Sequence, residues 1–535
     1  MFPLSKRTLL VYFKSNGSFF VWNVGVKVVQ QTDVLIIGCG LAGLATAWGL
    51  AKKGVNVSIL AIEDDLEKPK VHQGIAGIAF QGDRDRPSDF AQDLVNCGEG
   101  YCNQRAVEQL STLGPQYVQE VLIEELGVEF DQSDEGIYKR QVYPGHSTAR
   151  VVGHGYNTMA SLLKAFRAKL HEKSNVRFLT NRTVIDLLTL AQHSTKHTDA
   201  YKQPSCVGAY VLNGETGEVE TLLAKETVIA TGGVGHLFLH TTNGAYSRGD
   251  GLALAARAGA RVMHLDKVEF KTTTLYVPGE PRCSVTESLR EAGAVLINSK
   301  GQEFLGAYAN EMDGYSNQAV SRAICTEMTR CQEGYVWMDL SKKDPAWIKG
   351  TFPHEYEICL SKGYDITKEK IPVVPAAHYF AGGIMIDRTG QTSLKRLRAI
   401  GEVGCSGVHG RAALAGVPGL EALVWANTCA KDIINGLDRF AFYFPSIKKM
   451  GTGRVPVDHS LLLQDWNTVR QTMWNYVGIV KDTPRIRRAN SLLGDLYREI
   501  RMLYNEATLS SEFLGLYNGV HCSMMMARVA GGYQF

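Results

Sequence analysis

The 535-residue sequence lacks the features that mark several classes of protein. Lysine plus arginine (57) nearly balance aspartate plus glutamate (54), and no long basic run occurs, so nothing indicates a nucleic-acid partner. No run of 18 apolar residues predicts a membrane-spanning helix. The eleven cysteines include no CxxC pair and no Cys/His spacing suited to zinc or an iron–sulfur cluster. We therefore expect no bound metal, and free thiols in a reducing, cytoplasmic compartment.

The first 30 residues have the character of an extension outside the fold. Lys6 and Arg7 precede the apolar run Leu9–Phe13, which is too short for a membrane span. A signal peptide needs a longer apolar run and a small-residue cleavage site. The whole chain is too long for a single core, and its 45% hydrophobic and 21% charged residues are ordinary for a globular protein. We expect two to four domains.

A strand, a glycine-rich loop and a helix follow one another near the start of the fold. Asp33–Ile37 has the apolar character of a buried parallel strand, and Leu44–Lys53 has helical apolar spacing. Val55–Leu60 reads as a second strand. This order predicts a βαβ unit and places the pattern GxGxxG where dinucleotide-binding proteins have it. The residues of the pattern are Gly38, Cys39, Gly40, Leu41, Ala42 and Gly43.

Each glycine of this loop has its own physical task. Gly38 permits the tight turn, Gly40 lets the backbone reach a pyrophosphate, and Gly43 lets helix and strand pack closely. The N-terminus of the helix then offers free N–H groups and the positive end of its dipole to phosphates. The loop therefore predicts a bound dinucleotide; the alternative is a glycine-rich turn that binds nothing.

The end of the second strand departs from this motif. An acidic residue there often binds the ribose hydroxyls, but Ala61 and Ile62 occupy the position and Glu63 follows them. Either other groups bind the ribose, or Glu63 shifts into the place of the usual acid.

Two later segments favour FAD over NAD. Thr227–Gly235 reads as a buried strand that ends in the glycine turn of Gly232 and Gly233. Ala399–Gly404 reads as another glycine-ended strand and contains Glu402. Three such strands, spread widely along the chain, suit a long cofactor bound by a domain that another domain interrupts. Taken alone, Ala399–Gly404 is equally consistent with an ordinary strand end.

With these segments in place, the sequence resembles the succinate dehydrogenase/fumarate reductase flavoprotein superfamily, and within it most closely the L-aspartate oxidase family. The resemblance runs from about Asp33 to Arg528. The flavin-linking histidine of succinate dehydrogenases falls at about Lys68, so the resemblance implies noncovalent FAD. The segments that carry it are Gln73–Phe80, Pro144–Ser147, Thr241–Ala260, Val374–Asp387, Ile400–Gly410 and, for the aspartate oxidase family in particular, Met473–Ala489.

The resemblance implies an α/β fold of three parts. After the N-terminal extension (1–30) comes a Rossmann-like FAD-binding domain (31–264 and 379–442), which is interrupted by an α+β capping domain (265–378). A C-terminal helical domain (443–535) ends the chain. Helical apolar patterning from Leu461 to Met526 supports the last part independently. Beyond the glycine loop, the residues implied to bind FAD are Ile62, Gly74, Ala76, Gly77, Gly232, Gly233, Asp250, Glu402, Pro418 and Gly419.

The family's activity is FAD-dependent oxidation of L-aspartate to iminoaspartate, the first step of quinolinate and NAD synthesis. The resemblance thus implies a small dicarboxylate or amino-acid substrate, O2 or fumarate as electron acceptor, and quinolinate synthase as a candidate partner. The implied catalytic residues are Lys271, Glu287, Arg290 and His378. The alternative interpretations are structural: His378 as a buried, hydrogen-bonded residue beside a strand, and Glu287 with Arg290 as a surface pair at i,i+3.

Several substrate-pocket positions depart from the family. Asn317 stands where the family has its catalytic arginine, and Lys271 stands in place of a histidine. Ala413 replaces a carboxylate-binding arginine, with Arg411 two residues earlier and able to swing in, and Tyr143 replaces a glutamate. Losing a bidentate arginine leaves a buried carboxylate poorly paired.

Three hypotheses follow for the pocket: a divergent aspartate oxidase, an enzyme for another small acid or amine, or an FAD-binding relative that has lost catalysis. A fumarate reductase or succinate dehydrogenase flavoprotein is the alternative within the superfamily. The last segment and the missing flavin-linking histidine speak against that alternative.

Overall fold

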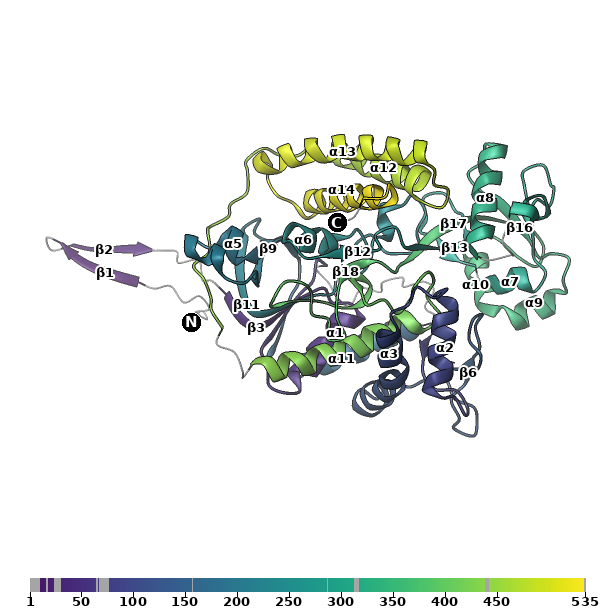
Figure 1. The fold of residues 1–535 in the computed structure, drawn as a ribbon, viewed down its shortest axis with the longest axis horizontal. Coiled ribbons are helices and arrows are strands. Elements are labelled where there is room, and N and C mark those ends of the chain that lie inside the picture. Colours follow the sequence, from purple (N-terminus) through teal and green to yellow (C-terminus); the bar gives the residue numbers. More distant parts are fainter. Residues whose placement is uncertain are drawn as a thin grey trace.

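The main body of the protein is an α/β domain, with a second sheet at one end and a layer of helices along one side (Figure 1). A short hairpin, β1 (Leu10–Ser15) with β2 (Ser18–Asn23), lies away from this body. The computed structural model describes residues 10–15, 18–23, 30–63, 66, 77–155, 157–285, 287–311, 317–437 and 442–533.

The main sheet confirms the predicted βαβ unit. Its core strands run parallel, with β3 between β4 and β11, while β10 and β9 continue the sheet in antiparallel pairing. The spatial order is β8 (Val176–Leu179), β4 (Val57–Leu60), β3 (Gln30–Ile37), β11 (Val219–Ile229), β10 (Cys206–Asn213) and β9 (Arg182–Thr189), with β19 (Leu397–Ala399) parallel to the end of β11.

Both faces of the main sheet are covered, which explains why β3 is apolar without interruption. Val34 and Ile36 pack into the core formed with α1 (Leu41–Ala51) and α11 (Val417–Leu437). Leu35 and Ile37 point to the opposite core, which the C-terminal helices help to fill. Alternate residues of a strand face opposite sides, so a strand buried on both faces needs apolar residues throughout.

The first helix begins three residues before the apolar periodicity predicted. Leu41 opens α1 directly after Gly40, and the helix ends before the turn at Gly54. Leu41–Gly43 reads as part of the glycine loop in the sequence, yet it forms the first turn, where backbone N–H groups have no partner within the helix.

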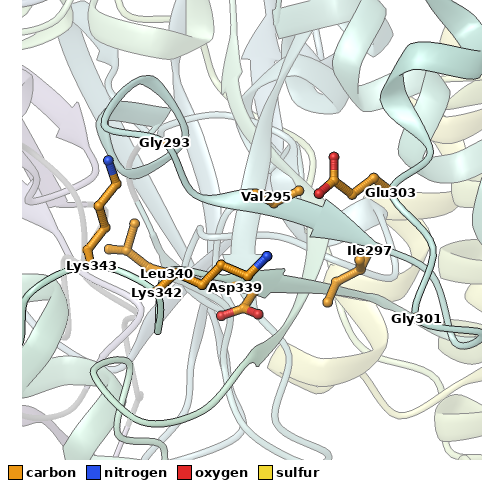
Figure 2. A pocket seen from close by; sticks show the side chains of 9 residues that line it. All are labelled: Gly293, Val295, Ile297, Gly301, Glu303, Asp339, Leu340, Lys342 and Lys343. Carbon is orange, nitrogen blue, oxygen red and sulfur yellow. The ribbon is translucent and has the colours of Figure 1, made fainter.

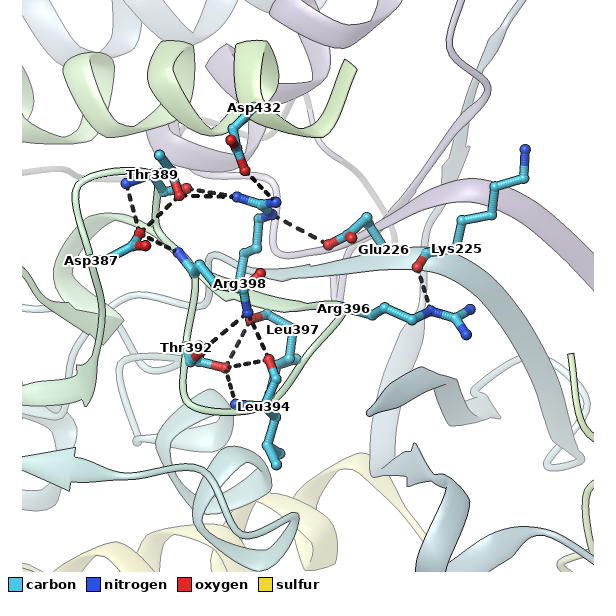
Figure 3. Close-up of polar contacts among 11 residues, drawn as sticks. Lys225, Glu226, Asp387, Thr389, Thr392, Leu394, Arg396, Leu397, Arg398 and Asp432 are labelled. Carbon is cyan, nitrogen blue, oxygen red and sulfur yellow. Dashed lines mark hydrogen bonds and ion pairs between the residues drawn. The ribbon is translucent and has the colours of Figure 1, made fainter. Parts of the chain in front are cut away.

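The late strand β19 is held to the early part of the domain by buried charge. The guanidinium of Arg398 lies between Asp432 on α11 (2.7 Å) and Glu226 on β11 (3.3 Å), and it donates to the carbonyl of Thr389 (3.1 Å) (Figure 3). Burial raises the pKa of Glu226, and Arg398 opposes that rise. Arg396 extends the link by donating to the carbonyl of Lys225.

We expect Arg398→Met to lower the free energy of unfolding by about 3 kcal/mol, because it leaves the Glu226 carboxylate buried without a cation. Urea unfolding measures this loss, and adding Glu226→Gln should recover most of it. The matched surface variant is Arg498→Met, whose partner Asp495 is mostly exposed, with an expected loss of about 0.5 kcal/mol or less. Equal losses for the two arginine variants would contradict the structural role of Arg398.

The capping domain is built on a separate sheet that shares no strand with the first. Its order is β14 (Cys283–Ser284), β13 (Val268–Leu275), β17 (Ile371–Phe380), β16 (Val336–Asp339) and β15 (Val295–Ile297). The helices beside it are α7 (Glu287–Glu291), η4 (Leu305–Glu311), α8 (Asn317–Cys331), α9 (Pro345–Thr351) and α10 (Pro353–Ser361).

The C-terminal helices confirm the helical patterning read from Leu461 onward. Side chains of Asp458, Asp482 and Ser510 cap three of them by accepting from backbone N–H groups of the first turn. These elements are α12 (His459–Thr472), the π-helical η6 (Met473–Val477), α13 (Thr483–Glu506) and α14 (Ser511–Ala530). No helix in the described residues is both long enough and apolar enough to cross a membrane.

The fold is therefore a Rossmann-like α/β domain interrupted by an α+β cap and followed by helices, as predicted. The domain limits given above stay our proposal.

The remaining helical elements are α2 (Pro87–Cys97), α3 (Gln104–Tyr117), η1 (Val118–Glu125), α4 (Thr158–His171), α5 (Leu190–His193), η2 (His197–Tyr201), η3 (Gly235–Leu237), α6 (Asp250–Arg257) and η5 (Gly401–Val403). The remaining strands are β5 (Ile78–Ala79), β6 (Arg140–Gln141), β7 (Val151–Val152), β12 (Val262–Met263), β18 (Gly383–Met385) and β20 (Gly404–Cys405).

Candidate functional site

The glycine loop lies at the carboxyl end of β3, and its three glycines have different surroundings. A Cβ at Gly38 (φ 114°) would lie 2.3 Å from the Ala230 carbonyl oxygen, and one at Gly43 would lie 2.2 Å from the Gly38 oxygen. These two positions need glycine for packing alone. A Cβ at Gly40 would meet no atom of the described residues within 4 Å, so the space that they leave there is available to a ligand.

Two helix N-termini meet beside this space. No side chain caps α1 at Gly40, which leaves the first N–H groups of that helix for another acceptor. The first turn of α11 contains Pro418 and Gly419, and a Cβ at Gly419 would be 3.9 Å from the side chain of Leu41. Uncapped N–H groups and aligned dipoles favour an anion, so this cradle fits the diphosphate of a dinucleotide.

The ends of β11 and β19 bring a carboxyl group to the same region. The Glu402 side chain accepts a hydrogen bond from the Phe380 N–H (3.0 Å) and another from the Gly233 N–H. A Cβ at Gly233 would be 2.1 Å from Glu402 Oε1, whereas Gly232 has φ 77° and open space beside it. The glycine pair predicted from the sequence therefore makes room for Glu402 and for a turn.

Burial, reinforced by the Glu421 carboxylate, raises the pKa of Glu402 from 4.5 to about 7 against these two hydrogen bonds. Since the folded state binds this proton more tightly than the unfolded chain, the group's stabilisation is complete below pH 4.5 and is lost as the pH rises through 7. We expect the apoprotein to lose up to about 3 kcal/mol between pH 5 and 8 through this group. Urea unfolding of Glu402→Gln apoprotein should lack that part of the pH dependence; an unchanged profile would contradict the assignment.

The sequence left open whether Glu63 shifts toward the glycine loop from its place after the second strand. Glu63 Oε2 lies 3.8 Å from the sulfur of Cys39, so the carboxyl group reaches the glycine loop from its shifted position. Ile62, predicted to bind the cofactor, directly precedes it and is half-buried. Glu63 is thus the acidic residue after β4 that lies beside the glycine loop.

Two other predicted cofactor residues have structural partners of their own. Asp250, the first residue of α6, accepts from Arg248 Nε (2.8 Å) and from Asn518 of α14 (2.8 Å). Gly77 has φ 149°, and a Cβ there would be 2.3 Å from the Val152 oxygen. Gly74, Ala76, Lys68 and the segment before Gly77 lie outside the described residues.

Three of the four predicted catalytic residues come together on β13, β17 and α7. Lys271 Nζ is 3.7 Å from Glu287 Oε2, and Thr272 donates to the other oxygen of that carboxylate (3.2 Å). His378 forms a hydrogen bond through Nδ1 with Thr242 Oγ1 (2.8 Å). Burial, aided by the positive charge of Lys271, lowers the pKa of His378 to about 3, so the imidazole is neutral. These groups form the polar cluster of the candidate substrate site.

The fourth residue, Arg290, lies one turn after Glu287 on α7, and its Nε is buried with no hydrogen-bond partner among the described residues. Glu287 forms its ion pair with Lys271. The alternative interpretation, a surface pair of Glu287 with Arg290, is therefore not the pair that the structure contains. Arg411 does not swing toward the cluster; it pairs with Glu99 (3.1 Å) and Tyr101 at the surface. Asn317 is exposed at the start of α8.

Sequence reasoning missed Glu269 in this cluster. Its Oε2 accepts from the backbone N–H of Ala413 (3.0 Å), across 144 residues of chain. Burial raises the pKa of Glu269, Lys271 opposes the rise, and the Glu287 carboxylate adds to it. The available signal was its position two residues before Lys271, since residues two apart on a strand share a face.

A second buried network ties β17 to α11 beside the cluster. Tyr379 Oη donates to Glu421 Oε2 (3.0 Å), His409 Nε2 lies 2.9 Å from the same oxygen, and Ser406 donates to Oε1. Burial and the Glu421 carboxylate raise the pKa of Tyr379 well above its usual value. The carboxylate is satisfied by three partners, which fixes the start of α11 relative to the cap strand.

A separate cavity of about 180 Å³ lies on the cap beside the paired strands β15 and β16 (Figure 2). Its polar side chains are Glu303, Asp339, Lys342 and Lys343, and Asp339 is already bound by Ser341 (2.7 Å). None of the predicted site residues lines it. This cavity therefore belongs to neither the cofactor cradle nor the polar cluster.

Known proteins are similar to this chain in sequence, and others are similar in fold. A family model described as an FAD binding domain matches residues 33–418. The L-aspartate oxidase of Pseudomonas aeruginosa is 32% identical over 498 residues, covering 91% of this chain and 90% of the relative. That of Vibrio cholerae is 34% identical over 510 residues, covering 94% and 93%.

Solved structures with the same fold are more distant in sequence. E. coli quinol fumarate reductase FrdA superposes with a TM-score of 0.78 at 20% identity, covering 94% of this chain and 89% of that one. Mycobacterium smegmatis Sdh1 superposes with a TM-score of 0.78 at 22% identity, covering 94% and 87%. At this identity the likeness concerns the fold alone.

Proposed function

The chain belongs to the L-aspartate oxidase family and is an FAD-dependent oxidoreductase, and we propose that it oxidises L-aspartate to iminoaspartate less efficiently than its relatives do. The observation that carries this proposal is the combination of the cofactor cradle at Gly40 with a substituted substrate cluster. The open space at Gly40, the uncapped start of α1 and the nearby Glu402 fit FAD.

In this proposal the cradle residues hold the cofactor without a covalent bond. The N–H groups of Leu41 and Ala42, with the first turn of α11, receive the diphosphate, and Glu63 or Glu402 receives hydroxyl groups. FAD supplies the two-electron acceptor chemistry when bound. The remaining task of the chain is to orient the substrate and to set its protonation state.

The polar cluster suits that task in part. Lys271 attracts one substrate carboxylate, and the neutral imidazole of His378, held by Thr242, can exchange a hydrogen bond with the substrate. The substrate amine must lose a proton before hydride leaves Cα, and we assign this proton to the Glu287 carboxylate, which lies 3.7 Å from Lys271. A second cationic clamp is missing where Ala413 and Asn317 stand, which explains the lower efficiency we propose.

The wider context is also part of the proposal. The reaction belongs to the start of quinolinate and NAD synthesis, with O2 or fumarate as final electron acceptor and quinolinate synthase as the enzyme that takes the product. We place it in the cytoplasm, a proposal supported by the eleven cysteines, none of which forms a disulfide in the described part of the chain. We also propose that four glycine and proline residues around the cradle contact FAD, because of where they lie: Gly232, Gly233, Pro418 and Gly419.

Purification followed by a visible spectrum tests the cofactor, and anaerobic mixing with substrates tests the reaction. We expect a yellow protein whose flavin is bleached by L-aspartate and not by succinate. Bleaching by succinate alone would favour a fumarate reductase or succinate dehydrogenase type of activity. A yellow protein that no amino acid or dicarboxylate reduces would favour a non-catalytic FAD-binding relative, for which the loss of cations at positions 317 and 413 is the supporting observation.

A further inference from the structure

Trp474 links the C-terminal helices to the other two parts of the chain. It lies in the π-helical segment η6, a rare form of helix that is frequent at functional sites. Its half-buried indole packs against the core of the main sheet and C-terminal helices, and also against the core of the cap. Two rings meet the indole edge-on, with centroid distances of 4.7 Å to His240 and 6.1 Å to Phe270 of β13.

The cap strands β13 and β17 pair irregularly around two of the predicted catalytic residues. Glu269 and Phe270 pair with the residues on either side of His378, which makes His378 the extra residue of a β-bulge. The register shifts again directly after Lys271. A bulge redirects a side chain but disrupts the ladder locally, so strand pairing alone does not fix the separation of Lys271 and His378.

On one side, Trp474 supports the strand residue next to Lys271. Phe270 directly precedes Lys271 on β13, and its ring is met edge-on by Trp474 (6.1 Å) and by Phe238 (5.4 Å). Successive side chains of a strand point to opposite faces, so this contact supports the backbone of Lys271 from the other face of the strand.

On the other side, Trp474 supports the segment that holds His378. The carbonyl of His240 accepts from the Ala377 N–H (2.9 Å), and the Thr242 N–H donates to the Ala377 carbonyl (3.0 Å). The Thr242 hydroxyl forms the hydrogen bond with His378 Nδ1 (2.8 Å). A displacement of the His240 ring would therefore reach His378 through three hydrogen bonds.

The His240 imidazole is itself held in one neutral form. Arg282 Nε lies 3.3 Å from its Nδ1, and the guanidinium donates to the carbonyls of Val277 (2.8 Å) and Glu280 (2.9 Å). Burial, aided by the charge of Arg282, lowers the pKa of His240 to about 3. The ring that Trp474 meets is thus uncharged and fixed from its far side.

We propose that Trp474 is a positioning residue, which sets the separation of Lys271 and His378 through the rings that it contacts. The inference rests on the proposed function, in which those two groups bind the substrate. It gives the C-terminal helices a part in the reaction, although the polar cluster itself is built on β13, β17 and α7. Groups that bind a substrate must be held closely, and a misplacement of about 1 Å can lower the rate by about a hundredfold.

Steady-state kinetics of the FAD-loaded full-length protein gives the first test. We expect Trp474→Ala to lower kcat/KM for L-aspartate by about 10- to 100-fold and to leave FAD affinity within about twofold of wild type, because the contacts act on the substrate groups and not on the cradle. Trp474→Phe keeps a ring that can meet His240 edge-on and should stay within about threefold of wild type. Trp474→Leu is of similar size without a ring and should lose about fivefold or more.

Titration of the oxidised flavin spectrum with succinate gives a readout without turnover. We expect Trp474→Ala to raise the succinate Kd by about tenfold in wild type and by less than about threefold in His378→Ala, because residues that act through one another are not additive. A merely structural role would give the same factor in both backgrounds. The matched control is Trp347→Ala, which removes a partly exposed cap indole that meets Phe352 edge-on at 5.8 Å and should change the Kd and kcat/KM by no more than about twofold.

The outcomes separate the inference from the function beneath it. Wild-type flavin that no amino acid reduces overturns the proposed function, and the succinate titrations then decide the inference. Equal factors in the two backgrounds, or a Trp474→Ala enzyme as active as wild type, overturn the inference alone. Flavin that is neither reduced by amino acids nor perturbed by succinate overturns both. If Trp474→Ala fails to fold, Trp474→Phe and Trp474→Leu decide, and equal activity of these two contradicts the role of the ring.

Discussion

Replacing Gly40 with valine is expected to weaken FAD binding by about a hundredfold or more while leaving the fold intact. Gly40 has φ −77° and ψ −176°, a conformation that valine adopts without strain, and among the residues that the structure describes none has an atom within 4 Å of its Cβ position. The added side chain would fill only the space in which we place the diphosphate. Phosphate would then lose contact with the first N–H groups of α1, and charge-assisted hydrogen bonds of this kind are among the strong ones.

Fluorescence titration of apoprotein with FAD measures the affinity, and thermal unfolding of the apoprotein measures the fold. The matched control is Gly451→Val, a loop glycine that also has open space at its Cβ position. We expect both apoproteins to melt within about 2 °C of wild type, as substitutions in open space usually do. Normal FAD affinity in Gly40→Val would show that the cradle does not bind FAD. The proposed function would then lose its basis.

Replacing Lys271 with methionine is expected to lower kcat/KM for amino-acid substrates by about 100- to 1000-fold. The ammonium group is the cation that we assign to the substrate carboxylate, and it also faces Glu287 at 3.7 Å. Without it, a substrate carboxylate would enter a cluster of two carboxyl groups and a neutral His378. Truncating one partner of a buried charge pair costs much of its energy through the charge left unpaired.

Steady-state kinetics of the FAD-loaded variants checks this expectation. Lys271→Arg keeps the charge and should retain activity within about tenfold of wild type, although its planar fork differs in geometry. Lys362→Met removes a cap lysine from a partly exposed pair with Glu280 and should leave kcat/KM unchanged. A Lys271→Met enzyme as active as wild type would exclude Lys271 from the substrate site.

The sequence predicted the cofactor scaffold well because its requirements are local. A buried parallel strand, three glycines at fixed spacing and a helix start lie within about twenty residues, and each has a backbone reason that a sequence pattern reveals. The helical region from Leu461 onward was readable for the same reason. The first turn of α1 was misread as loop, because glycine and alanine give little periodicity before Leu44.

The substrate cluster was only partly predictable, because tertiary packing decided which charges face one another. Lys271, Glu287 and His378 were found through family resemblance, but nothing in the sequence joined Glu269 to the backbone N–H of Ala413.

By itself, then, the sequence determined an FAD-binding α/β chain with an interrupting cap, since strand, turn and helix propensities act between near neighbours. Only the tertiary structure decided the charge balance of the substrate site and the partners of Asp250 and Arg411. Electrostatic interaction depends on distance and burial in space, and residues hundreds of positions apart acquire both only when the two sheets and the helices pack together.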